Sequence, residues 1–112
     1  MTDRLFVLNP GWTDDLGGPW YCPAGAVIEG VLAFHPDLTT QLDITRLDHP
    51  RPRPPVIDLV GEDHQGCPIL VLDEVFDWPD AQTSEATGRR FLQDEAILPY
   101  LVARYGIGRP HP

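Results

Sequence analysis

The chain has 112 residues, a length that predicts a single domain with one modest hydrophobic core over residues 1–112. Apolar residues make up 42% of it, which argues against a disordered chain even though thirteen residues are proline. The net charge is −9, with eight arginines, no lysine and seventeen carboxylates, and this balance argues against a nucleic-acid partner.

The sequence contains neither a charged-then-apolar signal segment at its start nor an apolar run of transmembrane length. We therefore expect a cytoplasmic protein with no membrane partner. In the cytoplasm, Cys22 and Cys67 are expected to be free thiols rather than a structural disulfide.

The N-terminal third predicts a strand, a loop and a helix. Residues 5–8 form a short apolar run that ends in a turn-forming Asn-Pro-Gly sequence, as expected for a buried strand. Residues 12–20 are rich in glycine and aspartate and predict a loop. From Pro23 to His35 the apolar residues recur at helical spacing, and Pro36 ends the segment. The apolar positions of this predicted helix are Val27, Ile28, Val31, Leu32 and Phe34.

The middle of the chain predicts a strand and a short helix on either side of a proline-rich segment. Residues 42–47 alternate loosely between apolar and polar, which indicates a strand near a sheet edge. Residues 49–55 are dense in proline and predict an extended polyproline segment, in which Arg51 and Arg53 are exposed. Residues 56–60 predict a short helix that ends at a glycine.

The C-terminal part predicts two strands and a helix. Ile69–Leu72 is a continuous apolar run and the best candidate for a central strand. Residues 73–88 predict a long irregular loop, and residues 90–92 predict one more short strand. A last helix begins near Asp94 and ends at a glycine, with Pro99 expected to kink it. Its predicted buried face comprises Ala96, Ile97, Leu98, Leu101 and Val102.

A cysteine and a proline lie between the first predicted strand and the first predicted helix, within the segment Trp20–Gly25. Pro23 suits the first position of a helix, so Cys22 is predicted to be the N-cap. A helix N-terminus leaves backbone N–H groups unpaired and carries about half a positive charge, and both effects favour a thiolate. Cys22 is therefore the candidate nucleophile.

The predicted order is strand, helix, strand, short helix, strand, strand, helix, with a cysteine at the start of the first helix. This order resembles the thioredoxin fold, an α/β fold with a central mixed sheet flanked by helices, and within it glutaredoxins and the N-terminal domain of glutathione transferases. Tyr21-Cys22-Pro23 resembles the active-site turn of these proteins. Gly66–Val71 is similar to the segment that supplies the cis-proline of the fold. Leu92–Leu101 resembles the segment that opens a helix in the transferases. Nearly the whole chain also resembles a bacterial family of small thioredoxin-like domains that has no assigned function.

The resemblance implies a glutathione site. Pro68 would be cis, and the backbone of Cys67 would pair with the cysteinyl part of glutathione. At the pocket for the γ-glutamyl end, the related proteins have Ser or Thr where this chain has Asp94, whose carboxylate would repel that of the ligand. On the sequence alone, an N-cap is the better interpretation of Asp94. The implied glutathione-binding residues are Tyr21, Pro23, Cys67, Pro68, Gln93 and Asp94.

One departure from the resemblance restricts the chemistry. Gly25 stands three residues after Cys22, where a dithiol protein has its second cysteine, so exchange within one turn is impossible. What remains is a monothiol route, in which Cys22 attacks a disulfide and a separate thiol resolves the mixed disulfide. The helical C-terminal domain of full transferases is not expected here either, so conjugation chemistry is not expected.

Cys67 has two interpretations. In thioredoxin-like proteins the residue before the cis-proline faces the active-site cysteine, so Cys22 and Cys67 are expected to be neighbours and, with Cα atoms within ~7 Å, a redox pair. The alternative is that Cys67 is a small buried hydrophobic residue, the usual state of a free cysteine.

Other clusters give weaker signals. Asp63, His64 and Cys67 do not have the spacing of a metal site, and His64 is expected to be a solvated loop residue. Trp12, Trp20 and Tyr21 either line a pocket beside the cysteine or pack at the edge of the core.

Two functions follow. One is a glutathione-linked monothiol disulfide oxidoreductase that acts through Cys22, with glutathione as co-substrate or a protein disulfide as partner. The other is a binding or homodimerisation module that has lost catalysis. The fold alone does not distinguish between these two functions.

Overall fold

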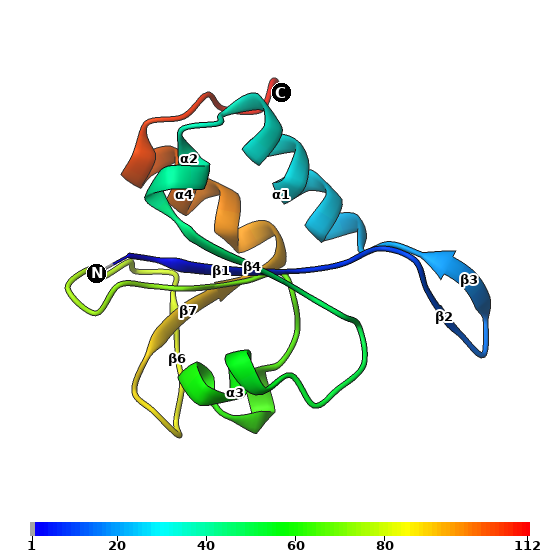
Figure 1. Cartoon of the computed structure of the whole chain (residues 1–112). Helices are drawn as coiled ribbons and strands as arrows, with labels where there is room; N and C mark the ends of the chain where they lie inside the picture. The colour runs from blue at the N-terminus through cyan, green and yellow to red at the C-terminus, as the bar shows by residue number, and fades with distance from the viewer. Residues whose placement is uncertain (1) are drawn as a thin grey trace.

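A five-stranded mixed sheet forms the centre of the protein, shown in Figure 1 as a computed structural model that describes residues 2–112. The strand order is β4-β1-β5-β7-β6. β1 pairs in parallel with β4, and every other pairing in this sheet is antiparallel. The predicted mixed sheet and its central strand after Pro68 are confirmed. The strands are β1 (Arg4–Leu8), β4 (Asp43–Leu47), β5 (Ile69–Val71), β6 (Gln82–Thr83) and β7 (Arg90–Gln93).

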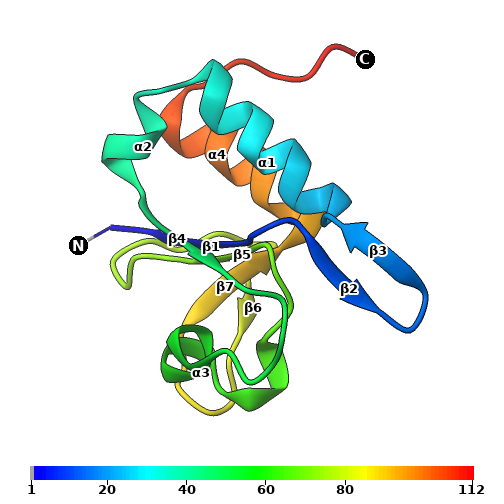
Figure 2. The ribbon, with the colours of Figure 1, turned by 45° about the vertical axis from the view of Figure 1, so that its right-hand side comes forward.

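Helices cover both faces of the sheet (Figures 1 and 2). On one face lie α1 (Pro23–Phe34), α2 (Leu38–Gln41) and α4 (Ile97–Tyr105), and on the other lies α3 (Pro54–Val60). Two 3₁₀ turns, η1 and η2, precede β5 and α4. They span Glu62–His64 and Asp94–Ala96.

The three inner strands alternate their side chains between two hydrophobic clusters. Leu5 and Val7 of β1 point into the cluster beneath α1 and α4, whereas Phe6 between them points into the cluster beneath α3. In the same way Leu70 and Leu92 join the first cluster, whereas Ile69, Val71 and Phe91 join the second. Side chains alternate across a strand, so a strand covered on both faces is a continuous apolar run.

The predicted loop over residues 12–20 is wrong, because the structure forms a hairpin there. β2 (Trp12–Asp14) and β3 (Gly17–Trp20) pair only with each other, and Figure 2 shows them projecting from the body. A glycine at φ +116° closes the turn, and the indole N–H of Trp20 donates to Asp14 at 3.0 Å. At its base, Trp12 stacks on His49 with 4.4 Å between ring centroids.

Several further expectations need correction. α2 and β6 arise in segments that the sequence did not predict to be regular, and α3 begins at Pro54 because prolines suit the first helical turn. Pro99 is the third residue of α4, where its missing N–H has no intrahelical acceptor, so it leaves the helix intact. Val27 and Phe34 are exposed on α1, whereas Tyr100 on α4 is buried.

A buried carboxylate joins the N-terminus to the last helix. Asp3 is fully buried and accepts hydrogen bonds from the hydroxyls of Tyr100 and Tyr105 at 2.8 and 2.6 Å. Arg104 donates to the same carboxylate at 3.0 Å, and the backbone N–H of Asp73 does so at 2.6 Å. These bonds satisfy a charge that would otherwise be costly to bury.

Candidate functional site

Cys22 lies at the N-terminus of α1, as predicted. Its backbone is extended at the N-cap position, and Pro23 begins the helix. The backbone N–H of Gly25 donates to the Cys22 sulfur at 3.4 Å, which uses one of the N–H groups that a helix start leaves unpaired. The thiol is half-buried and free. Figure 1 shows this end of α1 just after the hairpin.

Cys22 and Cys67 are in contact, and the contact is between the side chain of Cys22 and the backbone of Cys67. The thiol of Cys22 donates to the carbonyl oxygen of Cys67 at 3.8 Å. The Cys67 thiol donates instead to the carbonyl of Gln65 at 3.7 Å, and its side chain packs against the cluster beneath α3. Burial raises the pKa of the Cys67 thiol, an effect that the charge of Arg53 partly offsets. Cys67 is thus held as a neutral thiol.

Arg53 is buried, with 5% of its surface exposed, so the expectation of an exposed arginine is wrong at this position. Its guanidinium donates to the carbonyl of Gln65 at 2.7 Å and to the carbonyl of His49. Its backbone N–H donates to the side chain of Gln65 at 2.7 Å. These bonds hold the proline-rich segment against the loop before Cys67. The sequence offered no signal for this role beyond an arginine between two prolines.

Pro68 and Gln93 lie at the same end of the sheet as Cys67. The Cys67–Pro68 peptide bond is cis, as are Gly18–Pro19 and Arg51–Pro52. Gln93 donates from its side-chain amide to the carbonyl of Gly66 at 3.0 Å, so it supports the loop that carries Cys67.

Asp94 does not cap a helix, which corrects the N-cap interpretation. It is the first residue of η2, its φ is +52°, and neither η2 nor α4 has a side-chain cap. Its backbone N–H donates to the carbonyl of Pro68 at 3.2 Å. Burial, with a smaller contribution from Glu95, raises the pKa of its carboxyl group. An apolar hollow of about 300 Å³ separates this turn from Pro23 at the start of α1.

The aromatic residues before Cys22 do not enclose it. Tyr21 is 65% exposed, Trp20 is exposed, and Trp12 stacks on His49. The predicted aromatic pocket wall is therefore wrong. These side chains pack at the base of the hairpin or face solvent.

His64 is half-buried and packs against Phe91 with 4.7 Å between ring centroids, so the expectation of a solvated residue is wrong. Among residues 2–112, no cluster of three or more histidine, cysteine, aspartate or glutamate side chains has the geometry of a metal site.

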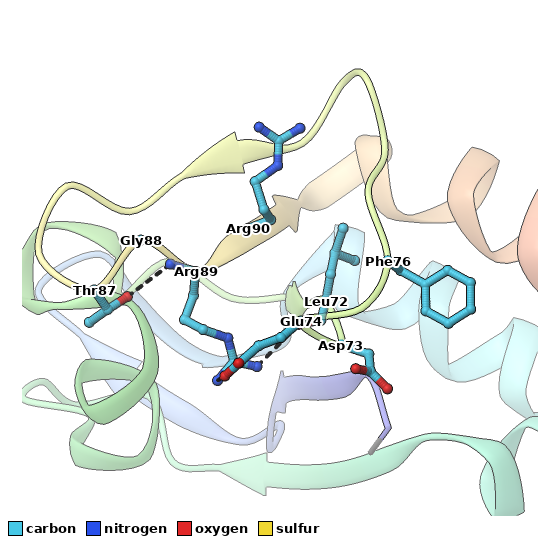
Figure 3. A pocket seen from close by; sticks show the side chains of 8 residues that line it. All are labelled: Leu72, Asp73, Glu74, Phe76, Thr87, Gly88, Arg89 and Arg90. Atoms are coloured by element: carbon cyan, nitrogen blue, oxygen red, sulfur yellow. Dashed lines mark hydrogen bonds and ion pairs between the residues drawn. The ribbon is translucent and has the colours of Figure 1, made fainter.

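A second hollow, of about 270 Å³, lies near the start of β7 and is shown in Figure 3. Arg89 forms an ion pair with Glu74 at 3.4 Å and donates to the carbonyl of Leu72 at 3.1 Å. Arg90 points away from this pair in Figure 3 and pairs with Asp77 at 3.0 Å. The arginines are neutralised by nearby carboxylates, so the hollow is a poor anion site.

The comparisons identify a family but no activity. A family model described as "Protein of unknown function (DUF3088)" matches residues 2–109. Neither the curated proteins nor the solved structures contain a match. Within residues 2–112 there is no helix of the length and apolarity that a membrane span requires.

Proposed function

The chain belongs to the DUF3088 family, and we propose that it is a thioredoxin-like protein that exchanges thiols and disulfides through Cys22. Its partner is glutathione or a protein disulfide. The family description assigns no activity, so the proposal rests on the fold and on the surroundings of the two cysteines.

The sheet supports the thioredoxin-like part of the proposal. A parallel β1-α1-β4 unit is followed by the antiparallel strands β5 and β7, and the sheet order is β4-β1-β5-β7 before the short edge strand. This arrangement resembles the core of the thioredoxin fold. The hairpin, α2 and β6 are additions to it.

The observation that carries the proposal is the position of the Cys22 sulfur. It accepts the N–H of Gly25 at 3.4 Å at the start of a 12-residue helix, and the residue as a whole is partly exposed. Backbone N–H groups and the helix dipole both stabilise negative charge at this position. A thiolate there meets the two needs of disulfide exchange, which are nucleophilic sulfur and access.

The exchange proceeds in two balanced steps. The Cys22 thiolate attacks the glutathione sulfur of a partner protein's mixed disulfide with glutathione, the Cys22–glutathione disulfide forms, and the partner protein's thiolate leaves. A free glutathione thiolate then attacks the glutathione sulfur of the Cys22 mixed disulfide, which forms oxidised glutathione and releases Cys22 as thiolate. Gly25 has no thiol to resolve the intermediate, so the second thiol must come from outside α1. A cytoplasmic location, where glutathione keeps thiols reduced, fits this chemistry.

Intact-mass spectrometry tests the proposal. The reduced protein is exposed briefly to oxidised glutathione, in parallel with the Cys22→Ser and Cys67→Ser variants. We expect one glutathione adduct on the unmodified chain and on Cys67→Ser, and none on Cys22→Ser. The absence of an adduct on the native chain, or an adduct that survives in Cys22→Ser, contradicts the proposal. A loss of two hydrogens that needs both cysteines would instead identify an intramolecular pair.

A module without catalysis is the second candidate. The observation that favours it is the exposure of Val27 and Phe34 on α1, which needs no reactive thiol to explain it. If Cys22 forms no glutathione adduct in the mass experiment, a binding module is the better interpretation of the protein.

A further inference from the structure

The outer face of α1 is apolar and exposed. Val27, the fifth residue of the helix, is 56% exposed, and Phe34, its last residue, is 83% exposed. Two hollows of about 300 and 480 Å³ follow this face, and both are lined by Val27 and Leu98. Figure 2 shows that no element of the sheet lies on the outer side of α1. A patch of this kind marks an interaction surface.

The middle of this face carries small side chains. Ala26 and Gly30 lie four residues apart and therefore share a face of the helix, and both line the larger hollow. A Cβ added at Gly30 would meet nothing within 4 Å. The backbone of α1 is therefore open to close approach at Gly30.

The charges at the two ends of the face have opposite signs. Asp94 and Glu95 line the hollow at the Pro23 end, and Arg109 lines the hollow at the Phe34 end. Among residues 2–112, none of these three side chains takes part in an ion pair. The two ends are separated by the length of α1, which is about 18 Å for twelve helical residues.

We propose that this face binds a second copy of the chain, with the two α1 helices packed antiparallel about a two-fold axis near Gly30. In a two-fold interface the same patch meets itself, so the start of one helix faces the end of the other. Arg109 of each copy then lies against Asp94 and Glu95 of the other. The order of groups beside α1, acidic at its start, apolar in the middle and basic at its end, is complementary to the same order reversed, which favours a second copy as the partner.

The dimer goes beyond the proposed exchange chemistry and does not depend on it. Its interface shares Pro23 and Asp94 with the implied glutathione site but does not use the Cys22 sulfur, and no step of the exchange requires a second copy. An inert Cys22 therefore leaves the dimer intact, and a monomeric protein leaves the exchange intact.

Sedimentation velocity on the full chain measures the association. At about 1 mM protein, a concentration that saturates a dimer of micromolar Kd, we expect a species of twice the 12.5 kDa chain mass. Gly30→Glu should weaken the dimer at least about 100-fold, because it buries an unpaired carboxylate in the interface. The same variant fits the monomer without a clash, and its thermal midpoint should equal or exceed that of the native chain.

Charge reversal tests the antiparallel register. Arg109→Glu and Glu95→Arg should each weaken the dimer about tenfold by placing like charges together, and the double variant should recover most of the loss. Arg4→Glu is the matched control, because Arg4 is an exposed side chain on β1 and lies in neither hollow.

Two results would overturn the proposal. One is a chain that stays monomeric at about 1 mM, which would leave the α1 face for a different protein. The other is a dimer that Gly30→Glu does not weaken, which would place the interface elsewhere. Failure of the double variant to recover binding would reject the antiparallel arrangement.

Discussion

The Cys22 thiol points at the carbonyl oxygen of Cys67 across 3.8 Å, although 45 positions separate the two residues in the chain. The two sulfur atoms nevertheless have different surroundings. Cys22 accepts a helix N–H, whereas Cys67 donates to the carbonyl of Gln65 and packs against the cluster beneath α3. This asymmetry predicts that the two thiols differ in reactivity.

The first prediction is selective alkylation of the native protein. At neutral pH, iodoacetamide should modify Cys22 at least about tenfold faster than Cys67, because the thiolate is the reactive form and burial raises the pKa of Cys67. Since a raised pKa keeps that thiol protonated at neutral pH, its rate should increase only at alkaline pH. Peptide mass spectrometry over a time course measures both rates. In denaturant the two rates should converge, and equal rates in the native state would contradict the prediction.

The second prediction concerns Gly25. A Cβ built at this position lies 3.4 Å from the Cys22 Cβ and 3.7 Å from its sulfur, and the Cβ atoms of disulfides are about 3.5–4.5 Å apart. Gly25→Cys should therefore form a disulfide with Cys22 under mild oxidation and lose two hydrogens in the intact mass. Gly25→Ser is the control of similar size and should show no such loss. A Gly25→Cys variant that stays reduced would show that this turn cannot take the disulfide geometry.

The third prediction concerns the buried carboxylate of Asp3. Asp3→Asn removes the ion pair with Arg104 and replaces one of the two acceptor oxygens by a donor, so either the backbone N–H of Asp73 or the two tyrosine hydroxyls lose their acceptor. We expect a loss of about 2–3 kcal/mol in the free energy of unfolding, measured by urea denaturation. Asp43→Asn, at an exposed position on β4, should change it by less than about 0.5 kcal/mol. Equal effects of the two changes would mean that the Asp3 network contributes little.

The fourth prediction is a loss of stability at high pH. Burial and the hydrogen bond to Asp3 raise the pKa of Tyr105 to about 12, and the same two causes raise the pKa of Tyr100. In the unfolded chain both ionise near about 10. Their contribution to stability is therefore complete below about pH 10 and is lost as the pH rises toward the folded pKa values.

Urea midpoints measured across this range should fall with increasing pH, and the fall should be shallower in Tyr105→Phe. Tyr21→Phe is the control, because the Tyr21 side chain is 65% exposed. A slope that Tyr105→Phe leaves unchanged would show that other groups cause the loss.

The elements with strong periodicity were predictable. β1, α1 and β5 occur within one or two residues of their predicted bounds, because apolar spacing and proline or glycine signals agree there. The hairpin before Cys22 was not predictable in this way. Its strands lie outside both hydrophobic clusters, and a tryptophan stacked on a distant histidine holds it in place.

Local signals in the sequence specify which segments are buried strands and where the first helix begins, because a proline after Cys22 and an apolar period act within a few residues. Which side chains face solvent on that helix, and which polar residues are buried, depends on how the elements pack together. Arg53 is buried because the carbonyls of His49 and Gln65 accept hydrogen bonds from its guanidinium, whereas Phe34 is 83% exposed although the apolar period predicts that it is buried. The contact between Cys22 and Cys67 also depends on the tertiary structure. It follows from the order of the strands in the sheet, which no local pattern of residues specifies.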